Sequence, residues 1–320
     1  MEQSPPRASN WTLTDGNAGN VRQVRALATA LGRPAREWVL QARAPWRWLA
    51  PRTLPGAGLA FGDDFHDALA TPPRLAIGCG RQAALATRLL RRRGAQAIQI
   101  LDPRLATRHW DLVIAPEHDD LSGDNVIRLL GSLNPIDDAW LQSARSHFSA
   151  LATLQQPRTA LLLGGNSAHA RFEPAWWDAL ADRLQRLVDA EDGCLLATTS
   201  RRTPADVTAR LHQRFAGRPG MVWSGRADGP NPYPGLLACA DRIVCTADSV
   251  NMLSEACATA LPVFVAGIDA VRGRPRRFVD SLVGLGRVRP VDDTLAAFPV
   301  TPLRETARVA AEVRRRLALG

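Results

Sequence analysis

Residues 243–265 read IVCTADSVNMLSEACATALPVFV, and this one stretch contains a complete strand–helix–strand unit. The apolar run 243–245 predicts a buried strand, and the small polar residues 246–249 predict a turn in which Ser249 is a typical helix N-cap. A second apolar run follows Pro262. Two strands joined by a helix in this way are parallel, so the stretch predicts an α/β fold.

Short apolar runs alternate with helix-length segments along the rest of the chain as well. One series predicts strands at 11–13, 75–77, 97–101 and 112–115, and a second at 159–163, 194–199, 221–223, 242–245 and 262–265. A mostly helical stretch at 136–157 separates the two series. We therefore predict two Rossmann-like parallel-sheet domains, residues 1–150 and 151–320, that face a cleft between them. An amphipathic helix at 303–319 is expected to close the second domain.

The composition excludes several classes of enzyme. All 40 basic residues are arginine, and Walker A loops, Schiff-base enzymes and pyridoxal enzymes all need a lysine. The net charge of +9 favours an anionic ligand. Because arginine replaces lysine throughout the chain, we interpret the charge as a compositional effect and predict no nucleic-acid partner.

Cysteine usage and hydropathy point to the cytoplasm. The five cysteines are odd in number and form no CxxC pattern, so neither a disulfide framework nor a zinc site is indicated. The N-terminal residues are polar, and no apolar run is long enough to span a membrane. The segment 45–49, PWRWL, combines tryptophans with a cation. Such a segment suits a peripheral contact with the inner membrane, or ordinary packing on a domain surface.

The second domain carries most of the candidate binding residues. A helix that begins near Ser249 at the carboxyl edge of a sheet presents free N–H groups to an anion, and Glu255 two turns later can accept both hydroxyls of a ribose. Other polar residues at predicted strand ends complete the expected binding site for a nucleotide sugar: Gly164, Gly165, Asn166, Ser200, Arg201, Tyr233 and Asp248. Each also has a structural interpretation, as part of a tight turn at the end of a strand, as a solvated charge in a loop, or as a side chain that fills the gap between the predicted domains.

The first domain supplies candidates for the acceptor side and for acid–base chemistry. Asp15 follows the first predicted strand and is a candidate general base or an Asx turn, and His118 between carboxylates is a second candidate base or a structural histidine. The neighbouring residues expected at the cleft are Gly16, Gly19, Asn20 and Arg81. The segment 78–83 also fits G-x-G-x-x-G/A, which leaves dinucleotide binding as an alternative.

Seven segments together resemble a known family. They read WTLTDGNAGNVRQ, IGCGRQAA, PEHD, LGGNS, TSRRTP, NPYPGLLA and TADSVNMLSEA, in this order. The set resembles bacterial relatives of the plant mitochondrial-fission family, which is classed with the GT-B glycosyltransferases. Glu255 followed seven residues later by Pro262 is similar to the nucleotide-sugar motif of that class.

The resemblance implies transfer of a sugar from a nucleoside diphosphate sugar to a cell-envelope or lipid-linked acceptor. It implies no cofactor and no metal, because helix N-termini and arginines meet the diphosphate charge. Where the family has Gly-His, this chain has Gly19-Asn20, so no acid–base role is expected at that position. Two alternatives remain: a nucleotide-sugar epimerase or hydrolase, and a non-catalytic interaction protein.

Overall fold

A computed structural model describes residues 10–319 and divides the chain into two compact units. Unit 1 consists of the described residues up to Pro135 together with the segment that starts at Glu305, and unit 2 is Ile136–Arg304. Residues 1–9, which make up most of the polar N-terminal stretch, lie outside the described residues.

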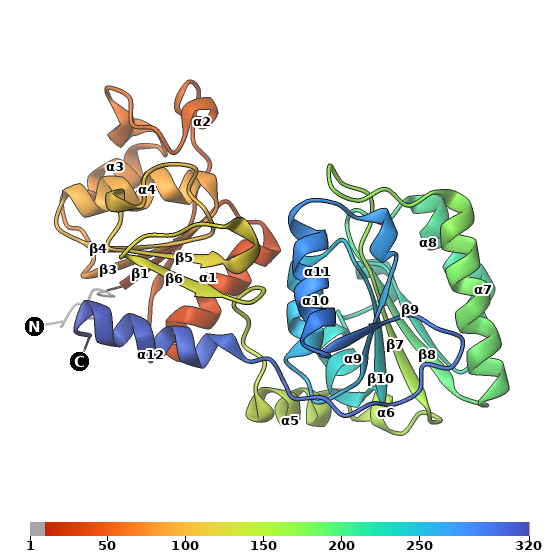
Figure 1. The fold of residues 1–320 in the computed structure, drawn as a ribbon. Helices are drawn as coiled ribbons and strands as arrows, with labels where there is room; N and C mark the ends of the chain where they lie inside the picture. The colour runs from red at the N-terminus through yellow and green to blue at the C-terminus, as the bar shows by residue number, and fades with distance from the viewer. Residues whose placement is uncertain (1–9, 320) are drawn as a thin grey trace, which may run out of the picture. The chain divides into compact units, whose positions relative to one another are not determined.

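Unit 1 is built on six parallel strands in the order β2-β1-β3-β4-β5-β6 (Figure 1). The strands are β1 (Asn10–Thr14), β2 (Arg36–Val39), β3 (Leu75–Cys79), β4 (Gln96–Ile100), β5 (Leu112–Pro116) and β6 (Val126–Leu129). The α-helices are α1 (Ala18–Ala30), α2 (Trp46–Leu49), α3 (Asp63–Ala68), α4 (Arg81–Arg92) and α12 (Glu305–Leu317), and the 3-10 helices are η1 (Ala57–Leu59), η2 (Thr107–His109) and η3 (Glu117–Asp119).

The core of unit 1 follows from the alternation of side chains along each strand. Leu75 and Ile77 of β3 lie in an apolar cluster that contains Val313 of α12, whereas Ala76 between them lies in a cluster with Phe65 of α3. Successive strand residues point to opposite faces of a sheet, so helices cover this sheet on both sides. Figure 1 shows α1 and α12 on one face and α3 and α4 on the other.

Unit 2 contains a second sheet of six parallel strands, in the order β12-β11-β10-β7-β8-β9. Its strands are β7 (Arg158–Leu163), β8 (Cys194–Thr199), β9 (Gly220–Trp223), β10 (Arg242–Thr246), β11 (Val263–Ala266) and β12 (Val288–Pro290). Its helices are α5 (Asp138–His147), α6 (Ser149–Ala152), α7 (Pro174–Ala190), α8 (Ala205–Phe215), η4 (Arg226–Asp228), α9 (Tyr233–Cys239), α10 (Val250–Cys257), η5 (Ile268–Ala270) and α11 (Arg274–Gly284). In Figure 1, α7 and α8 lie on one side of this sheet and α10 and α11 on the other. The predicted α/β class, with two Rossmann-like parallel sheets and a C-terminal helix, is confirmed.

The division of the chain differs from the predicted domains in two places. The units separate after Pro135 rather than after residue 150, because α5 packs on α9 through a small apolar cluster that includes Ala144 and Ala238. The C-terminal helix α12 belongs to unit 1 rather than to the second domain, since Val309 and Val313 are fully buried in the core beside α1. An amphipathic pattern shows that a helix is buried on one face, but not which core it joins.

The five cysteines are free and buried, so no disulfide joins any two of them. Among residues 10–319, no helix is both long enough and apolar enough to cross a bilayer.

Candidate functional site

The strand order of unit 2 places two loops side by side at the carboxyl edge of the sheet. Counted along the chain from β7 to β12, the order from β9 to β12 is 3-2-1-4-5-6, which is the Rossmann arrangement. The connections from β7 and β10, which are neighbours, leave in opposite directions. Ligands of open α/β sheets bind at such a topological switch point, so the loops after β7 and β10 form the candidate site of this unit.

Asp248 links three loops at this switch point. Its side chain is fully buried and accepts hydrogen bonds from the Thr246 hydroxyl at 2.7 Å and from the Gly165 amide at 3.0 Å. The Arg202 guanidinium donates to the same carboxylate at 2.6 Å. A buried carboxylate needs such partners, and here they come from the loops after β7, β8 and β10. Asp248 therefore holds these three loops together.

Gly164 and Gly165 lie against protein atoms at this edge. The Gly164 amide donates to Thr246 at 2.7 Å, and the Gly165 amide donates to Asp248. A Cβ at Gly164 would overlap the Asp248 carboxylate, and one at Gly165 would overlap the Arg202 carbonyl oxygen. In this geometry the two glycines bring loops together rather than offer amides to a phosphate. Their predicted contact with a ligand stays a prediction.

In the loop after β8, the arginine that turns toward the site is Arg202 and not the predicted Arg201. Arg202 forms the ion pair with Asp248, while its side chain remains 40% exposed. Arg201 is exposed. The Ser200 amide donates to the Thr203 hydroxyl, which in turn donates to the Gly164 carbonyl at 2.5 Å. Two adjacent arginines point in different directions, and the sequence alone did not show which one turns inward.

Helix α10 is held at both of its ends. Ser249 is the N-cap, as predicted, and its hydroxyl accepts from the Met252 amide at 3.4 Å. At the other end, the buried Arg287 donates to the carbonyls of Cys257 and Thr259 at 3.0 and 2.8 Å. The first turn of α10 is half-buried, so its N-terminal amides lie near the surface.

Glu255 and Tyr233, predicted from separate motifs, meet in the structure. The Tyr233 hydroxyl at the start of α9 donates to the Glu255 carboxylate at 2.5 Å. Glu255 is only 2% exposed. The carboxylate is therefore enclosed by protein, with a hydroxyl group already bound to it.

Asn166, the last donor-side candidate, is exposed. Its side-chain oxygen accepts from the Phe172 amide at 2.8 Å and so shapes the loop that leads into α7.

A hollow of about 710 Å³ at the carboxyl ends of β11 and β12 was missed by the sequence analysis. Trp176 and Arg183 of α7 line one side, and Gly267 and Asp269 lie on the other. Gly267 has a φ of +75°, and a Cβ there would lie 2.7 Å from the Trp176 ring. A glycine directly after an apolar strand was the one available signal.

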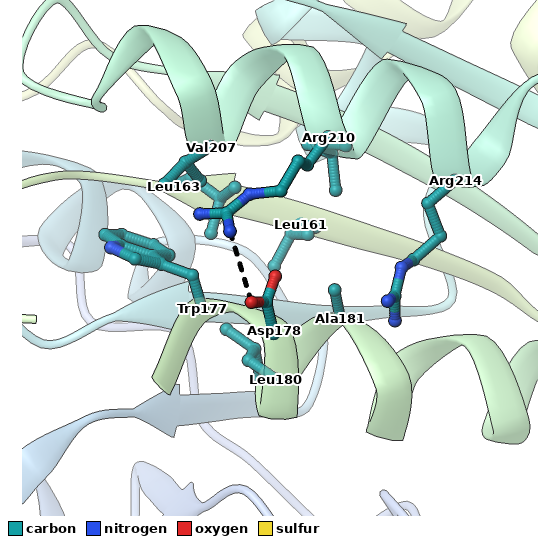
Figure 2. A pocket seen from close by; sticks show the side chains of 10 residues that line it. Leu161, Leu163, Trp177, Asp178, Leu180, Ala181, Val207, Arg210 and Arg214 are labelled. Carbon is teal, nitrogen blue, oxygen red and sulfur yellow. Dashed lines mark hydrogen bonds and ion pairs between the residues drawn. The ribbon is translucent and has the colours of Figure 1, made fainter. Parts of the chain in front are cut away.

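The space between α7, α8 and the sheet is too small for a nucleotide sugar. Figure 2 shows that apolar side chains and the Asp178–Arg210 ion pair surround it. Its volume of about 20 Å³ has room for about one water molecule. It is a packing defect between two helices, and we assign no function to it.

Unit 1 has its own topological switch point, between β1 and β3. Asp15 after β1 accepts from the Asn17 amide at 3.0 Å and from the Asn20 side chain at 2.9 Å. The Asn20 oxygen accepts in turn from the Cys79 thiol at the end of β3, at 3.4 Å. Gly80 has a φ of +93°. A Cβ at this position would collide with the Asn20 side chain. Burial, and then the Asp15 charge, raise the pKa of the Cys79 thiol.

Three further candidates of unit 1 are Gly16, Gly19 and Arg81. Gly16 and Gly19 belong to the loop and first turn around Asp15, with Gly16 at a φ of +83°. The Arg81 guanidinium donates to the Arg47 and Trp48 carbonyls at 2.8 and 3.2 Å, so it holds α2 in place. Ligand contacts of these three residues stay predictions.

His118 lies in η3 after β5, and its side chain is 7% exposed. Its Nε2 lies 4.0 Å from the Asp119 carboxylate. Since β5 is three strands from β1, about 14 Å separates the ends of these strands. The structure therefore does not bring the two candidate bases, Asp15 and His118, together.

No group of three or more His, Cys, Asp or Glu side chains within residues 10–319 is arranged to hold a metal ion. The expected independence of metal stays a prediction.

A sequence profile described as Mitochondrial fission ELM1 matches residues 18–317. The chain belongs to the mitochondrial fission ELM1 family. Mitochondrial fission protein ELM1 of Arabidopsis thaliana is 31% identical over an alignment of 277 residues, which covers 77% of this chain and 64% of the plant protein. Uncharacterized protein RP120 of Rickettsia prowazekii is 25% identical over an alignment of 349 positions, gaps included, which covers 94% of this chain and 96% of that protein.

Solved structures similar to this ELM1-family chain have the GT-B architecture. UDP-GlcNAc 2-epimerase of Methanocaldococcus jannaschii has a TM-score of 0.59 at 13% identity, with 97% of this chain and 100% of that chain covered. Os79 of O. sativa in complex with UDP has a TM-score of 0.52 at 12% identity, with 96% and 91% covered. At these identities the likeness concerns the fold alone, and it confirms the predicted GT-B-like fold of the family member.

Proposed function

We propose that unit 2 binds a nucleoside diphosphate sugar at the switch point between β7 and β10, and that the protein transfers the sugar to a cell-envelope or lipid-linked acceptor. The observation that carries the proposal is the convergence of Arg202 and the start of α10 at this edge. A guanidinium beside helix N–H groups is a typical arrangement for phosphate oxygens.

Arg202 replaces Arg201 as the proposed diphosphate contact. The Asp248 carboxylate orients its guanidinium, and the exposed part of the side chain is available to a ligand. Arginine forks bind phosphate through paired N–H groups, and an arginine already fixed by a neighbour loses little freedom on binding. With Ser249 and the first amides of α10, Arg202 would compensate the charge of a diphosphate leaving group without a metal.

Glu255 is the proposed partner of the ribose. In the structure a hydroxyl group, that of Tyr233, already donates to its carboxylate. A ribose hydroxyl offers the same chemistry, so ligand binding would replace the Tyr233 contact. The solved UDP-GlcNAc 2-epimerase of Neisseria meningitidis, which has a TM-score of 0.58 at 12% identity, is bound to UDP-GlcNAc. That neighbour supports a nucleotide sugar as the class of ligand.

Unit 1 would supply the acceptor side. Asp15 is held in one orientation by Asn17 and Asn20, as a general base that deprotonates an acceptor hydroxyl must be. Trp48 and Leu49 of α2 are 61% and 41% exposed, and they are the proposed contact with a membrane that carries a lipid-linked acceptor.

A thermal-shift panel of UDP-, GDP-, ADP- and CMP-sugars on the full chain tests this proposal. A ligand at a hundred times its Kd stabilises the folded state by about 2.7 kcal/mol, so one nucleotide should raise the melting temperature of unit 2 by several degrees. Glu255→Gln should reduce the shift strongly, because it removes the negative charge and replaces one of the two acceptor oxygens with an NH2 donor. Tyr233→Phe is the matched control and should retain the shift. The absence of any shift would contradict the proposal.

A non-catalytic binding protein is the second candidate. Two observations favour it. The amides of Gly164 and Gly165 already donate to protein atoms, and Glu255 is enclosed by protein. The absence of a shift with every nucleotide sugar of the panel would select this alternative, an interaction protein. Free sugar, or its epimer, formed without an acceptor would instead indicate a hydrolase or epimerase.

A further inference from the structure

A basic pocket of about 460 Å³ lies in unit 1, away from its switch point. Arg88, Arg91 and Arg92 of α4 line it together with His109 and Asp111. It adjoins the end of α4 and the start of β4, which is the amino edge of the sheet. The carboxyl edge, where Asp15 lies, is the opposite one, so this basic pocket is separate from the proposed acceptor site.

The three arginines share one face of α4. Arg88 precedes Arg91 and Arg92 by three and four residues, a spacing that stacks side chains on adjacent turns. Like charges at this spacing repel one another and destabilise the helix. The repulsion is offset if a shared anion binds between them.

Each of these arginines donates to a neutral oxygen atom, Arg91 to the Arg108 carbonyl at 2.7 Å. Arg88 is 6% exposed and donates to the Pro51 carbonyl at 2.5 Å, and Arg92 donates to the Thr53 hydroxyl at 3.2 Å. A carbonyl or hydroxyl fixes the direction of a guanidinium without cancelling its charge. Burial, and then the charge of Arg92, lower the pKa of Arg88.

Asp111 is the one carboxylate among the residues that line the basic pocket. It pairs with Arg91 at 3.0 Å, and its second oxygen accepts from the Ala97 amide at 2.7 Å. Three guanidinium groups against one carboxylate leave an excess of two positive charges.

The pKa of His109 reflects the charges of the arginines around this pocket. Burial lowers its pKa first, and the charges of Arg88, Arg108, Arg92 and Arg91 then lower it further. The charges of four arginines thus act on one half-buried imidazole.

We propose that the basic pocket binds a phosphate-bearing ligand. An excess of two charges matches a phosphate dianion, and guanidinium forks match its tetrahedral oxygens. The volume is larger than a single phosphate requires, so a diphosphate or a phosphate headgroup with its substituent fits. The phosphate comes from a soluble compound or from a lipid, and the experiment separates the two sources.

The imidazole of His109 gives a local readout that a second phosphate site would not move. Inorganic pyrophosphate is titrated into the full chain, and the histidine ring signals are followed by NMR over pH, with His109 assigned by its loss in His109→Gln. A bound anion stabilises the imidazolium, so the pKa of His109 should rise with saturation. Sodium chloride at the same ionic strength should give a smaller, non-saturating rise.

Two variants with opposite expected effects test the residues. Arg92→Gln removes a donor and should weaken pyrophosphate binding about tenfold. Asp111→Asn removes the one carboxylate and should strengthen it. Arg315→Gln is the matched control, because Arg315 is an exposed arginine paired with Glu312 on α12, and it should leave binding unchanged.

Vesicles of phosphatidylcholine with phosphatidylglycerol form the second arm. One possible result is that Arg92→Gln weakens vesicle binding, Arg315→Gln does not, and pyrophosphate has no effect on His109. This result supports the proposal with a lipid headgroup as the source of the phosphate. A saturable pyrophosphate effect on His109 supports it with a soluble source. The proposal is overturned if the pKa of His109 changes with ionic strength alone and if the Arg92→Gln and Arg315→Gln variants bind vesicles equally well.

Discussion

Asp248 shows how a single buried carboxylate can link three loops at one edge of a sheet. Asp248→Ala leaves the Gly165 amide and the Thr246 hydroxyl without their acceptor inside the protein. Because Arg202 is partly exposed, water can resolvate it, and most of the loss comes from the two buried donors. We expect unit 2 to lose about 3 kcal/mol of unfolding free energy, measured by urea denaturation.

Asp206→Ala is the control for this substitution. Asp206 pairs with Arg210 on the surface of α8, with 66% of its side chain exposed. Its removal should cost about 0.5 kcal/mol or less. Equal losses in the two variants would contradict the assignment of Asp248 as the link between the three loops.

The residues at this site also show what sequence reasoning could reach. Polar residues after apolar strands located the switch point, and the Ser249 cap follows from local chemistry. Whether Asp248 binds a ligand or folds back onto Gly165, 83 residues earlier, depends on strand order, which no local pattern contains. The choice between Arg201 and Arg202 depends on the same tertiary contact.

At the scale of elements, the strands that were missed share one property. β2, β6 and β12 all lie at sheet edges, and each has exposed residues in place of a continuous apolar run. β2 reads Arg-Glu-Trp-Val, and none of its residues is fully buried. Periodicity detects a strand through its burial, so central strands were predicted and three of the four edges were not.

Helix α12 gives a prediction at this scale. Val313→Ala truncates a fully buried side chain in the cluster shared with α1 and should cost unit 1 about 2 kcal/mol. Unit 2 should melt as before, although α12 follows it in sequence. Calorimetry or hydrogen exchange, resolved by unit, measures both transitions. Val283→Ala on α11, at a side chain that is 38% exposed, should change neither transition appreciably. A loss of stability in unit 2 would contradict this placement of α12.

At the scale of the whole molecule, unit 2 is an insertion within unit 1. The Asn134 amide donates to the Thr306 hydroxyl at 3.1 Å, and that hydroxyl donates back to the Asn134 carbonyl at 2.7 Å. The chain therefore leaves unit 1 and re-enters it at adjacent points. The ends of unit 2 are also close to each other, since Arg304 and Asp138 form an ion pair at 2.7 Å. Closely spaced ends are typical of domains that tolerate insertion and excision.

This arrangement predicts that unit 1 folds without unit 2. Residues 1–135 joined through a short Gly-Ser linker to 305–320 should melt in one cooperative transition by circular dichroism, because Asn134 and Thr306 need no long span between them. Residues 1–135 alone should be much less stable, since the loss of α12 exposes the apolar face that Val309 and Val313 cover. If the two shortened chains are equally stable, α12 is dispensable to the core of unit 1, and the division of the chain at Pro135 and Glu305 is not a division between folding units.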